Sequence, residues 1–214
     1  MELNILTGGP VEFLPPDILK KAKADTWIGV DHGAVYLAQH GIRPLFSIGD
    51  FDSATPKEQA LVRKFSHKLI TAIPEKDQTD TELALLECEL TYSPERINIY
   101  GATGGRLDHF LANLLSVLNI DFPKLVEKVC FIDRQNLITF YLPGEHELRK
   151  APEMKYLAFI PLTAVTGLTL SDEKYRLTDQ KTAGPLAYIS NEFLGSTAHF
   201  KFTSGVVCVI QSRD

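Results

Sequence analysis

The chain has 214 residues, of which 44% are hydrophobic, and this is enough to bury the core of one large domain or two small ones. Its 22 basic and 27 acidic residues give a formal net charge of −5 and include no basic run, so nucleic acid is not an expected partner. No stretch approaches the roughly 20 apolar residues of a membrane span, and the N-terminus MELNILTGG lacks the pattern of a signal peptide. We therefore expect a globular, cytoplasmic protein without a membrane segment.

Short apolar runs alternate with amphipathic stretches over the first 120 residues, which is typical of a parallel sheet covered by helices. The predicted strands are Leu3 to Leu6, Trp27 to Val30, Leu45 to Ile48, Lys68 to Ile73 and Arg96 to Tyr100. Each of them is followed by a segment with helical spacing. The pattern predicts an N-terminal α/β domain with a mainly parallel sheet flanked by helices.

One of the two clearest helices is predicted in TDTELALLECEL. Thr79 and Glu82 have the spacing of a capping box, so the helix should begin at Thr79. Leu83, Leu86 and Leu90 would then share one face.

The other clear helix is predicted in RLDHFLANLLSVLNI, where leucines recur with helical spacing and should form an apolar stripe against the sheet. The stripe consists of Leu107, Leu111, Leu114 and Leu118. Arg106 and Asp108 would lie in the first turn of this helix. His109 lies beside the stripe, where it is either a hydrogen-bonded structural residue or a catalyst.

Helical periodicity ends after about residue 125, and β-rich runs follow. They begin with VCFID, continue through LITFYL and KYLAFIPL to GVVCVIQS, and are separated by Pro, Gly and Asp turns. We therefore predict two domains, an α/β domain over residues 1–125 and an all-β, sandwich-like domain over residues 126–214.

Glycine and aspartate follow each of the five predicted strands. They are Gly8 and Gly9, Asp31, Asp50 and Asp52, Asp77 and Asp80, and finally Gly101, Gly104, Gly105 and Asp108. Ligands of open α/β sheets bind beyond the carboxyl ends of the strands. We therefore expect these residues to converge on one rim of the sheet.

A single aspartate at such a position is often only a turn or helix-cap residue. Several carboxylates crowded at one edge, however, repel one another unless a cation offsets their charge. In SIGDFDS, Asp50 and Asp52 are two residues apart and would point to the same side in an extended backbone. Paired oxygen ligands of this kind suit Mg²⁺, although the same pattern occurs in glycosyltransferases and phosphatases.

Two further segments predict phosphate contacts. The run DQTD, from Asp77 to Asp80, precedes a helix N-terminus, where backbone N–H groups can hold an anion. In YGATGGRLDH the glycines allow the backbone to approach a phosphate closely, and Arg106 follows them with a guanidinium suited to bidentate phosphate contact. Asp108 either ligates the metal or caps the helix. The residues alone therefore predict a magnesium-assisted reaction on a phosphate substrate.

The motifs GVDHGA, SIGDFDS, KDQTDTELAL and YGATGGRLDHFLANL, in this order and at these separations, resemble the thiamine pyrophosphokinase family. The resemblance covers about residues 25–120 well. In the β-rich half it is carried by general character and by the run ISNEF. It implies that the domain over residues 1–125 is catalytic and binds ATP, and that the domain over residues 126–214 binds thiamine. It also implies ATP and thiamine as substrates, Mg²⁺ as cofactor, release of AMP, and a homodimer whose active sites lie between the α/β domain of one subunit and the β domain of the other.

The resemblance also implies a role for individual positions. The acidic rim would consist of Asp31, Asp50, Asp52, Asp77 and Asp80, and the nucleotide side of Gly9, Gln78, Thr79, Gly104, Gly105, Arg106 and Asp108. Magnesium would be held by Asp50, Asp52 and Asp80. These three aspartates and Arg106 are the expected catalytic residues.

On the acceptor side, Ser190 and Asn191 would meet the thiamine. Some relatives stack thiamine on a tryptophan of the β domain, whereas Trp27, the only tryptophan here, belongs to the other domain. Phe193 is the expected substitute, since an aromatic face attracts the cationic thiazolium. The alternative for Phe193 is an ordinary core aromatic.

In the expected reaction the thiamine hydroxyl attacks the β-phosphorus of ATP in line, and positioning and charge neutralisation dominate catalysis. Two rival functions use the same residues. A magnesium-dependent phosphoesterase needs the acidic rim but no acceptor, and a thiamine or nucleotide sensor keeps the fold without the reaction.

Overall fold

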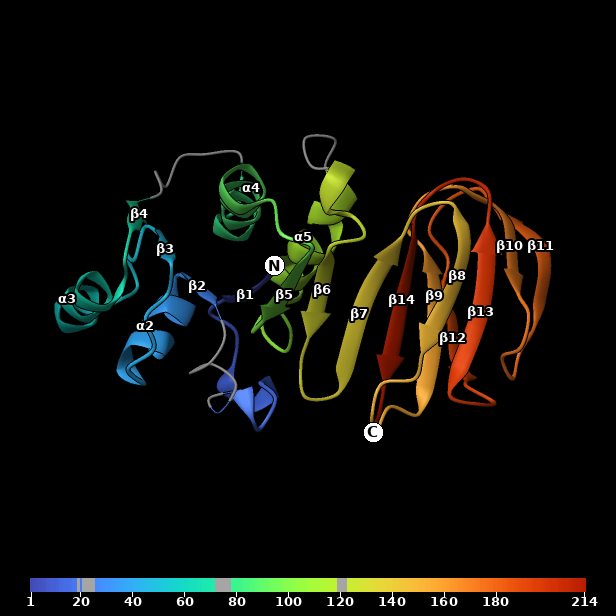
Figure 1. Cartoon of the computed structure of the whole chain (residues 1–214), viewed down its shortest axis with the longest axis horizontal. Coiled ribbons are helices and arrows are strands. Elements are labelled where there is room, and N and C mark those ends of the chain that lie inside the picture. Colours follow the sequence, from blue (N-terminus) through green and yellow to red (C-terminus); the bar gives the residue numbers. More distant parts are fainter. Residues whose placement is uncertain (19, 21–25, 72–77, 119–122) are drawn as a thin grey trace. The chain divides into compact units, whose positions relative to one another are not determined.

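The computed structural model describes residues 1–18, 20, 26–71, 78–118 and 123–214. It divides into two compact units, Met1–Arg134 and Gln135–Asp214 (Figure 1). The first unit contains a parallel sheet with the strand order β6-β5-β1-β2-β3-β4. The strands are β1 (Glu2–Leu6), β2 (Trp27–Val30), β3 (Phe46–Gly49), β4 (Leu69–Thr71), β5 (Arg96–Tyr100) and β6 (Val129–Ile132). The pairings among these six strands are parallel, which confirms the predicted sheet.

Helices cover this sheet, and Figure 1 shows α4 on the opposite face from α2. The helices are α2 (His32–Gln39), α3 (Pro56–Phe65), α4 (Asp80–Tyr92) and α5 (Leu107–Leu115), with short 3₁₀ helices η1 (Val11–Phe13), η2 (Ser116–Leu118) and η3 (Pro123–Leu125). The side chain of Thr79 caps α4 and forms the predicted capping box with Glu82. None of the helices in the described ranges has the length and apolar character of a membrane span.

The predicted apolar face of α4 is wrong. Its buried residues are Thr81, Ala84, Leu85 and Cys88, whereas Leu90 is exposed. This buried set has the same i, i+3, i+4, i+7 spacing as a leucine stripe. Its small members let the helix approach β2 and β3, against which it packs.

The predicted leucine stripe of α5 is also not a core face. Leu107 is 76% exposed and Leu111 is 50% exposed, while Asn113, Ser116 and Val117 are buried. The leucines therefore form an apolar surface on this unit.

One strand belongs to a different unit than we expected. The run VCFI, which we assigned to the β-rich domain, is β6 and pairs in parallel with β5. The compact units accordingly divide after Arg134. The reason is a long-range pairing that local sequence does not encode.

The second unit consists of two antiparallel sheets with the strand orders β12-β9-β14-β7 and β11-β10-β13-β8. The strands are β7 (Asn136–Tyr141), β8 (Gly144–Arg149), β9 (Tyr156–Pro161), β10 (Val165–Leu170), β11 (Leu177–Thr182), β12 (Tyr188–Glu192), β13 (Thr197–Phe202) and β14 (Val207–Ser212). Alternate residues of both sheets are buried in one shared core, which includes Phe159 of one sheet and Phe200 of the other. This is the predicted all-β sandwich-like unit.

Candidate functional site

The loops after β1 and β5 meet at the carboxyl ends of these strands. The Gly9 N–H donates to the carbonyl oxygen of Gly101 at 2.8 Å, and the Thr7 N–H donates to that of Tyr100 at 2.9 Å. A Cβ atom on Gly9 would lie 2.0 Å from the Gly101 oxygen, so only glycine fits this close approach. The structure thus joins the ends of β1 and β5, as the predicted convergence requires.

Asp31 lies where β2 ends, and its carboxylate reaches the end of β3. Its backbone N–H donates to the Ile48 oxygen at 3.0 Å. A Cβ atom on Gly49 would lie 2.2 Å from Asp31 Oδ1, so this carboxylate occupies the space beside the residue that precedes Asp50. Asp31 also has a φ of 48°, and such backbone strain in a non-glycine residue is concentrated at functional sites.

Asp50 and Asp52 lie in a turn, and the extended geometry that we expected for them is wrong. Phe51 between them has a φ of 56° and is buried. The Asp52 N–H donates to Asp50 Oδ1 at 3.0 Å. Burial of the Phe51 ring forces the turn, and the hydrogen bond keeps the two aspartates adjacent.

The DQTD segment is described only in part, because Asp77 lies outside the described residues. Thr79 Oγ1 accepts from the Glu82 N–H at 3.2 Å, and Glu82 Oε2 accepts from the Thr79 N–H at 2.8 Å. Asp80 is the first residue of α4, and Gln78 precedes the cap. The predicted capping box and the predicted start of the helix are therefore confirmed.

The donor set of the rim suits a hard cation, although no group of three or more His, Cys, Asp or Glu side chains within the described ranges is arranged to hold a metal. Asp50 and Asp52 supply two carboxylates from one turn, and the Asp52 N–H orients that of Asp50. Mg²⁺ typically takes only one or two carboxylates and completes its shell with water and substrate phosphates. The adjacent pair meets that requirement.

The glycine loop after β5 leads into α5. A Cβ atom on Gly104, whose φ is 79°, would lie 2.3 Å from the ring of Phe13, whereas the nearest atom to one on Gly105 would be 3.5 Å away. Gly104 is therefore required by packing against η1. The backbone at Gly105, next in the chain, is not closely covered by other atoms.

Arg106 forms a two-point ion pair with Asp108. Its Nε donates to Asp108 Oδ1 at 3.1 Å, and its second hydrogen bond goes to Oδ2. Asp108 Oδ1 also accepts from the His109 N–H. Hydrogen bonding to Arg106 lowers the pKa of Asp108 and raises that of Arg106. Asp108 thus orients a largely exposed guanidinium at the helix N-terminus. This role differs from metal ligation and from helix capping, the two alternatives that we left open.

Sequence reasoning missed Asp133, which lies directly after β6. It is buried, and its Oδ2 accepts from Thr103 Oγ1 at 2.7 Å. It obeys the same rule as the other rim residues, an aspartate after an apolar strand. We missed it because β6 had been assigned to the β-rich domain.

In the second unit, Ser190 and Asn191 lie where β12 departs from regular pairing with β9. Ser190 is exposed and has a φ of 60°. The Asn191 side chain is 3% exposed and grips the backbone of Tyr175, donating to its oxygen at 2.8 Å and accepting from its N–H at 2.9 Å. The Asn191 side chain therefore positions the backbone of Tyr175.

Phe193, our expected aromatic platform for the acceptor, is 8% exposed and packs in the core of the second unit. The structure agrees with the alternative, in which Phe193 is an ordinary core aromatic. The side chains alternate along the chain after Ser190, and this alternation turns Phe193 inward. Tyr175, held by Asn191, is 57% exposed. The signal for it was an aromatic residue within the polar turn SDEKYRL.

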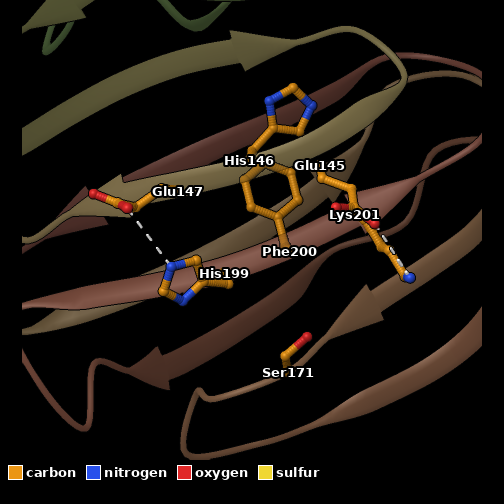
Figure 2. A pocket seen from close by; sticks show the side chains of 7 residues that line it. All are labelled: Glu145, His146, Glu147, Ser171, His199, Phe200 and Lys201. Carbon is orange, nitrogen blue, oxygen red and sulfur yellow. Dashed lines mark hydrogen bonds and ion pairs between the residues drawn. The ribbon is translucent and has the colours of Figure 1, made fainter.

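A shallow pocket of about 340 Å³ lies on the second unit (Figure 2). It is lined by Glu145, His146, Glu147, Ser171, His199, Phe200 and Lys201, and none of these is a predicted site residue. Figure 2 shows His199 facing Glu147, at 3.7 Å between Nε2 and Oε2, and His199 Nδ1 lies 2.7 Å from Asp172 Oδ2. Charged residues of the lining are paired with each other, His199 with Glu147 and Lys201 with Glu145.

Comparisons with known proteins cover both units. Residues 19–128 match a family model described as "Thiamin pyrophosphokinase, catalytic domain", and residues 145–207 match one described as "Thiamin pyrophosphokinase, vitamin B1 binding domain". A thiamine pyrophosphokinase of Bacillus subtilis (strain 168) is 39% identical over 214 residues, which cover 99% of each chain. The crystal structure of a thiamin pyrophosphokinase family protein from Enterococcus faecalis has a TM-score of 0.94 at 38% identity, with 100% of both chains covered. For that of a thiamine pyrophosphokinase from Bacillus subtilis the TM-score is 0.86 at 37% identity, again with 100% of both chains covered.

Proposed function

The chain belongs to the thiamine pyrophosphokinase family and is an enzyme of this type, and we propose that it transfers diphosphate from ATP to the hydroxyl of thiamine, which yields thiamine diphosphate and AMP. The observation that carries the proposal is the rim of the first unit. There the carboxylate of Asp31 lies against Gly49, next to the Asp50–Asp52 turn. Such clustered charge suits a metal-bound polyphosphate.

On the donor side, the open backbone at Gly105 and the guanidinium of Arg106 would receive the phosphates of ATP. Asp108 holds Arg106 by two hydrogen bonds, so the guanidinium is oriented before the substrate arrives. A planar guanidinium pairs with phosphate oxygens in two-point fashion. Arg106 would therefore neutralise charge that grows on the phosphoryl oxygens during transfer.

Asp50, Asp52 and Asp80 are the residues that would hold Mg²⁺. When bound, the ion would neutralise phosphate charge and orient the diphosphate group. The protein contributes the fixed geometry, in which the Asp52 N–H orients the Asp50 carboxylate. Little covalent chemistry falls to the side chains, because positioning and charge compensation dominate phosphoryl transfer.

On the acceptor side, we place Tyr175 where Phe193 was expected. The ring of Tyr175 is exposed, its backbone is clamped by Asn191, and Lys174 Nζ lies 5.4 Å from its centroid. This contact indicates that the ring face accepts cations, as a stacked thiazolium would require. Ser190 would meet the same ligand, since it is exposed at the irregular step of β12 and has a positive φ.

We further propose a homodimer in the cytoplasm, where ATP is supplied. Leu107, Leu111 and Leu115 are exposed at i, i+4 and i+8 on α5. They form a continuous apolar stripe on one helix face, and such surfaces mark protein contacts. A second copy of the chain is the occupant that agrees with the homodimer implied by the family resemblance.

The test is incubation with ATP, Mg²⁺ and thiamine, followed by mass spectrometry. We expect AMP and thiamine diphosphate in equal amounts, and neither product without thiamine. Phosphate release that does not depend on thiamine would establish a phosphoesterase instead. Thiamine binding in calorimetry without any turnover would establish a sensor.

A further inference from the structure

The segment from Ser171 to Arg176, between β10 and β11, carries Tyr175 and is anchored at several points. We call it the 171–176 loop. Asp172 holds one end through His199. The Asp172 carboxylate accepts a hydrogen bond from the His199 backbone N–H, and its Oδ2 lies 2.7 Å from Nδ1 of the His199 ring. Asn191 holds the other end through the backbone of Tyr175. The position of the Tyr175 ring therefore depends on the whole loop.

Glu173 lies at the centre of this loop, and its side chain is 0% exposed. Its backbone pairs with that of Phe193 in an isolated antiparallel bridge. Oε2 accepts from the Asp172 N–H at 3.1 Å. Oε1 is buried and has no hydrogen-bond partner among the described residues. One oxygen of a fully buried carboxyl is thus left without a donor.

This arrangement favours a neutral carboxyl. An ionised carboxylate in an apolar interior needs several donors to replace its lost hydration, whereas the described residues supply only the backbone N–H groups of Asp172 and of Glu173 itself. Burial raises the pKa of Glu173 from 4.5 to about 6. Ionisation of Glu173 therefore destabilises the packed position of the 171–176 loop at neutral pH.

We propose that Glu173 is a positioning residue of the acceptor site, whose neutral carboxyl keeps the 171–176 loop seated and whose ionisation releases the loop together with Tyr175. The inference rests on the proposed function of Tyr175 as the surface that receives thiamine. Glu173 itself does not touch the ligand, because it is buried behind the loop backbone. Thiamine affinity then falls as the pH rises and Glu173 loses its proton.

Other charged groups surround the loop. They are Asp172, His199, Glu147, Lys174 and Glu192. Hydrogen bonding to Asp172 raises the pKa of His199, so the anchor between them also weakens as the pH rises. Lys174 and Glu192 are paired with each other and keep their charges over this range. A test must therefore separate Glu173 from His199.

The experiment is calorimetric titration of the full chain with thiamine at pH 5.5 and pH 8, using the wild type, Glu173→Gln and His199→Gln. Ionisation of the ligand affects all three equally and cancels in their ratios. A free carboxyl with a pKa of 4.5 is already mostly ionised at pH 5.5, so the shift of the Glu173 pKa from 4.5 to about 6 limits the further loss of wild-type affinity between pH 5.5 and pH 8 to about fourfold. We expect Glu173→Gln to lack this loss and His199→Gln to retain it.

Two outcomes overturn the inference. In one, Glu173→Gln keeps the wild-type pH dependence of affinity. In the other, it binds more weakly by the same factor at both pH values, as a merely structural residue would. If the wild type forms no thiamine diphosphate, the proposed function itself has failed, and this is a separate result.

Hydrogen exchange on His199→Gln, which lacks the second pH-dependent anchor of the loop, provides an independent test. The opening free energy of the 171–176 loop, corrected for intrinsic exchange, should fall between pH 5.5 and pH 8. An opening free energy that is the same at both pH values would contradict the proposal.

Discussion

Two aromatic side chains near the end of β12 should respond in opposite ways to truncation. Phe193 packs in the core of the second unit, whereas Tyr175 is exposed and its backbone is held by Asn191. We predict that Phe193→Ala lowers stability and that Tyr175→Ala lowers thiamine affinity. The pair of variants tests the proposal that Tyr175, and not Phe193, provides the aromatic contact for thiamine.

The magnitudes follow from burial. Removing a buried phenylalanine ring costs about 3–5 kcal/mol, because the transfer free energy is lost and a cavity is left behind. With a typical urea dependence of about 2 kcal/mol per molar, the unfolding midpoint of Phe193→Ala should fall by about 2 M. Tyr175→Ala leaves no cavity, and surface substitutions of this kind change stability by only about 0.5 kcal/mol. Loss of a cation–π contact should instead weaken thiamine binding by about tenfold.

The assay is urea denaturation followed by circular dichroism, with thiamine affinity measured in parallel by calorimetry. Fluorescence of Trp27, the only tryptophan, reports on the first unit and helps assign each transition. Tyr175→Phe serves as the matched control, because it keeps the ring and should retain affinity. A stable Phe193→Ala variant that had lost thiamine affinity, beside a Tyr175→Ala variant with normal affinity, would refute the reassignment.

Three further predictions concern the rim, the loop and the surface helix. Asp52→Asn should fold normally and lose most diphosphate transfer in the product assay, and normal activity would remove Asp52 from the metal site. Glu173→Gln should raise the free energy of unfolding at pH 8 by about 2 kcal/mol and leave it unchanged near pH 4.5, since a pKa raised from 4.5 to about 6 penalises the folded state only above the unfolded value. Equal unfolding curves for both proteins at pH 8 would contradict this. Leu111→Glu should shift the sedimentation of the protein from dimer to monomer, whereas a wild type that sediments as a monomer would contradict the proposed dimer.

Local signals in the sequence were sufficient for the strands and for the start of α4. Thr79 and Glu82 are three residues apart, and a capping box depends only on that spacing. Strand ends were predictable for a similar reason, since an apolar run followed by glycine or aspartate reports a buried strand and the loop after it. The rule that parallel strands share one functional edge then placed Asp31 beside the Asp50 turn.

Helix faces could not be chosen from the sequence. α4 carries a leucine series and a second series with smaller residues, and both have helical spacing. Packing on β2 and β3 selected the smaller series, because close approach favours small side chains. On α5 the leucine series was left on the surface, an outcome that depends on the elements packed around the helix.

The sequence by itself determined the α/β and β-rich halves, the acidic and glycine-lined strand ends, and the family. Only the tertiary structure decided that β6 joins the first unit, that Asp133 follows it at the rim, and that Tyr175 rather than Phe193 is presented to solvent. The physical reason is how far apart in the sequence the interacting residues lie. Capping and turn preferences depend on neighbours in the chain, whereas strand pairing and the choice of buried face depend on contacts between distant segments.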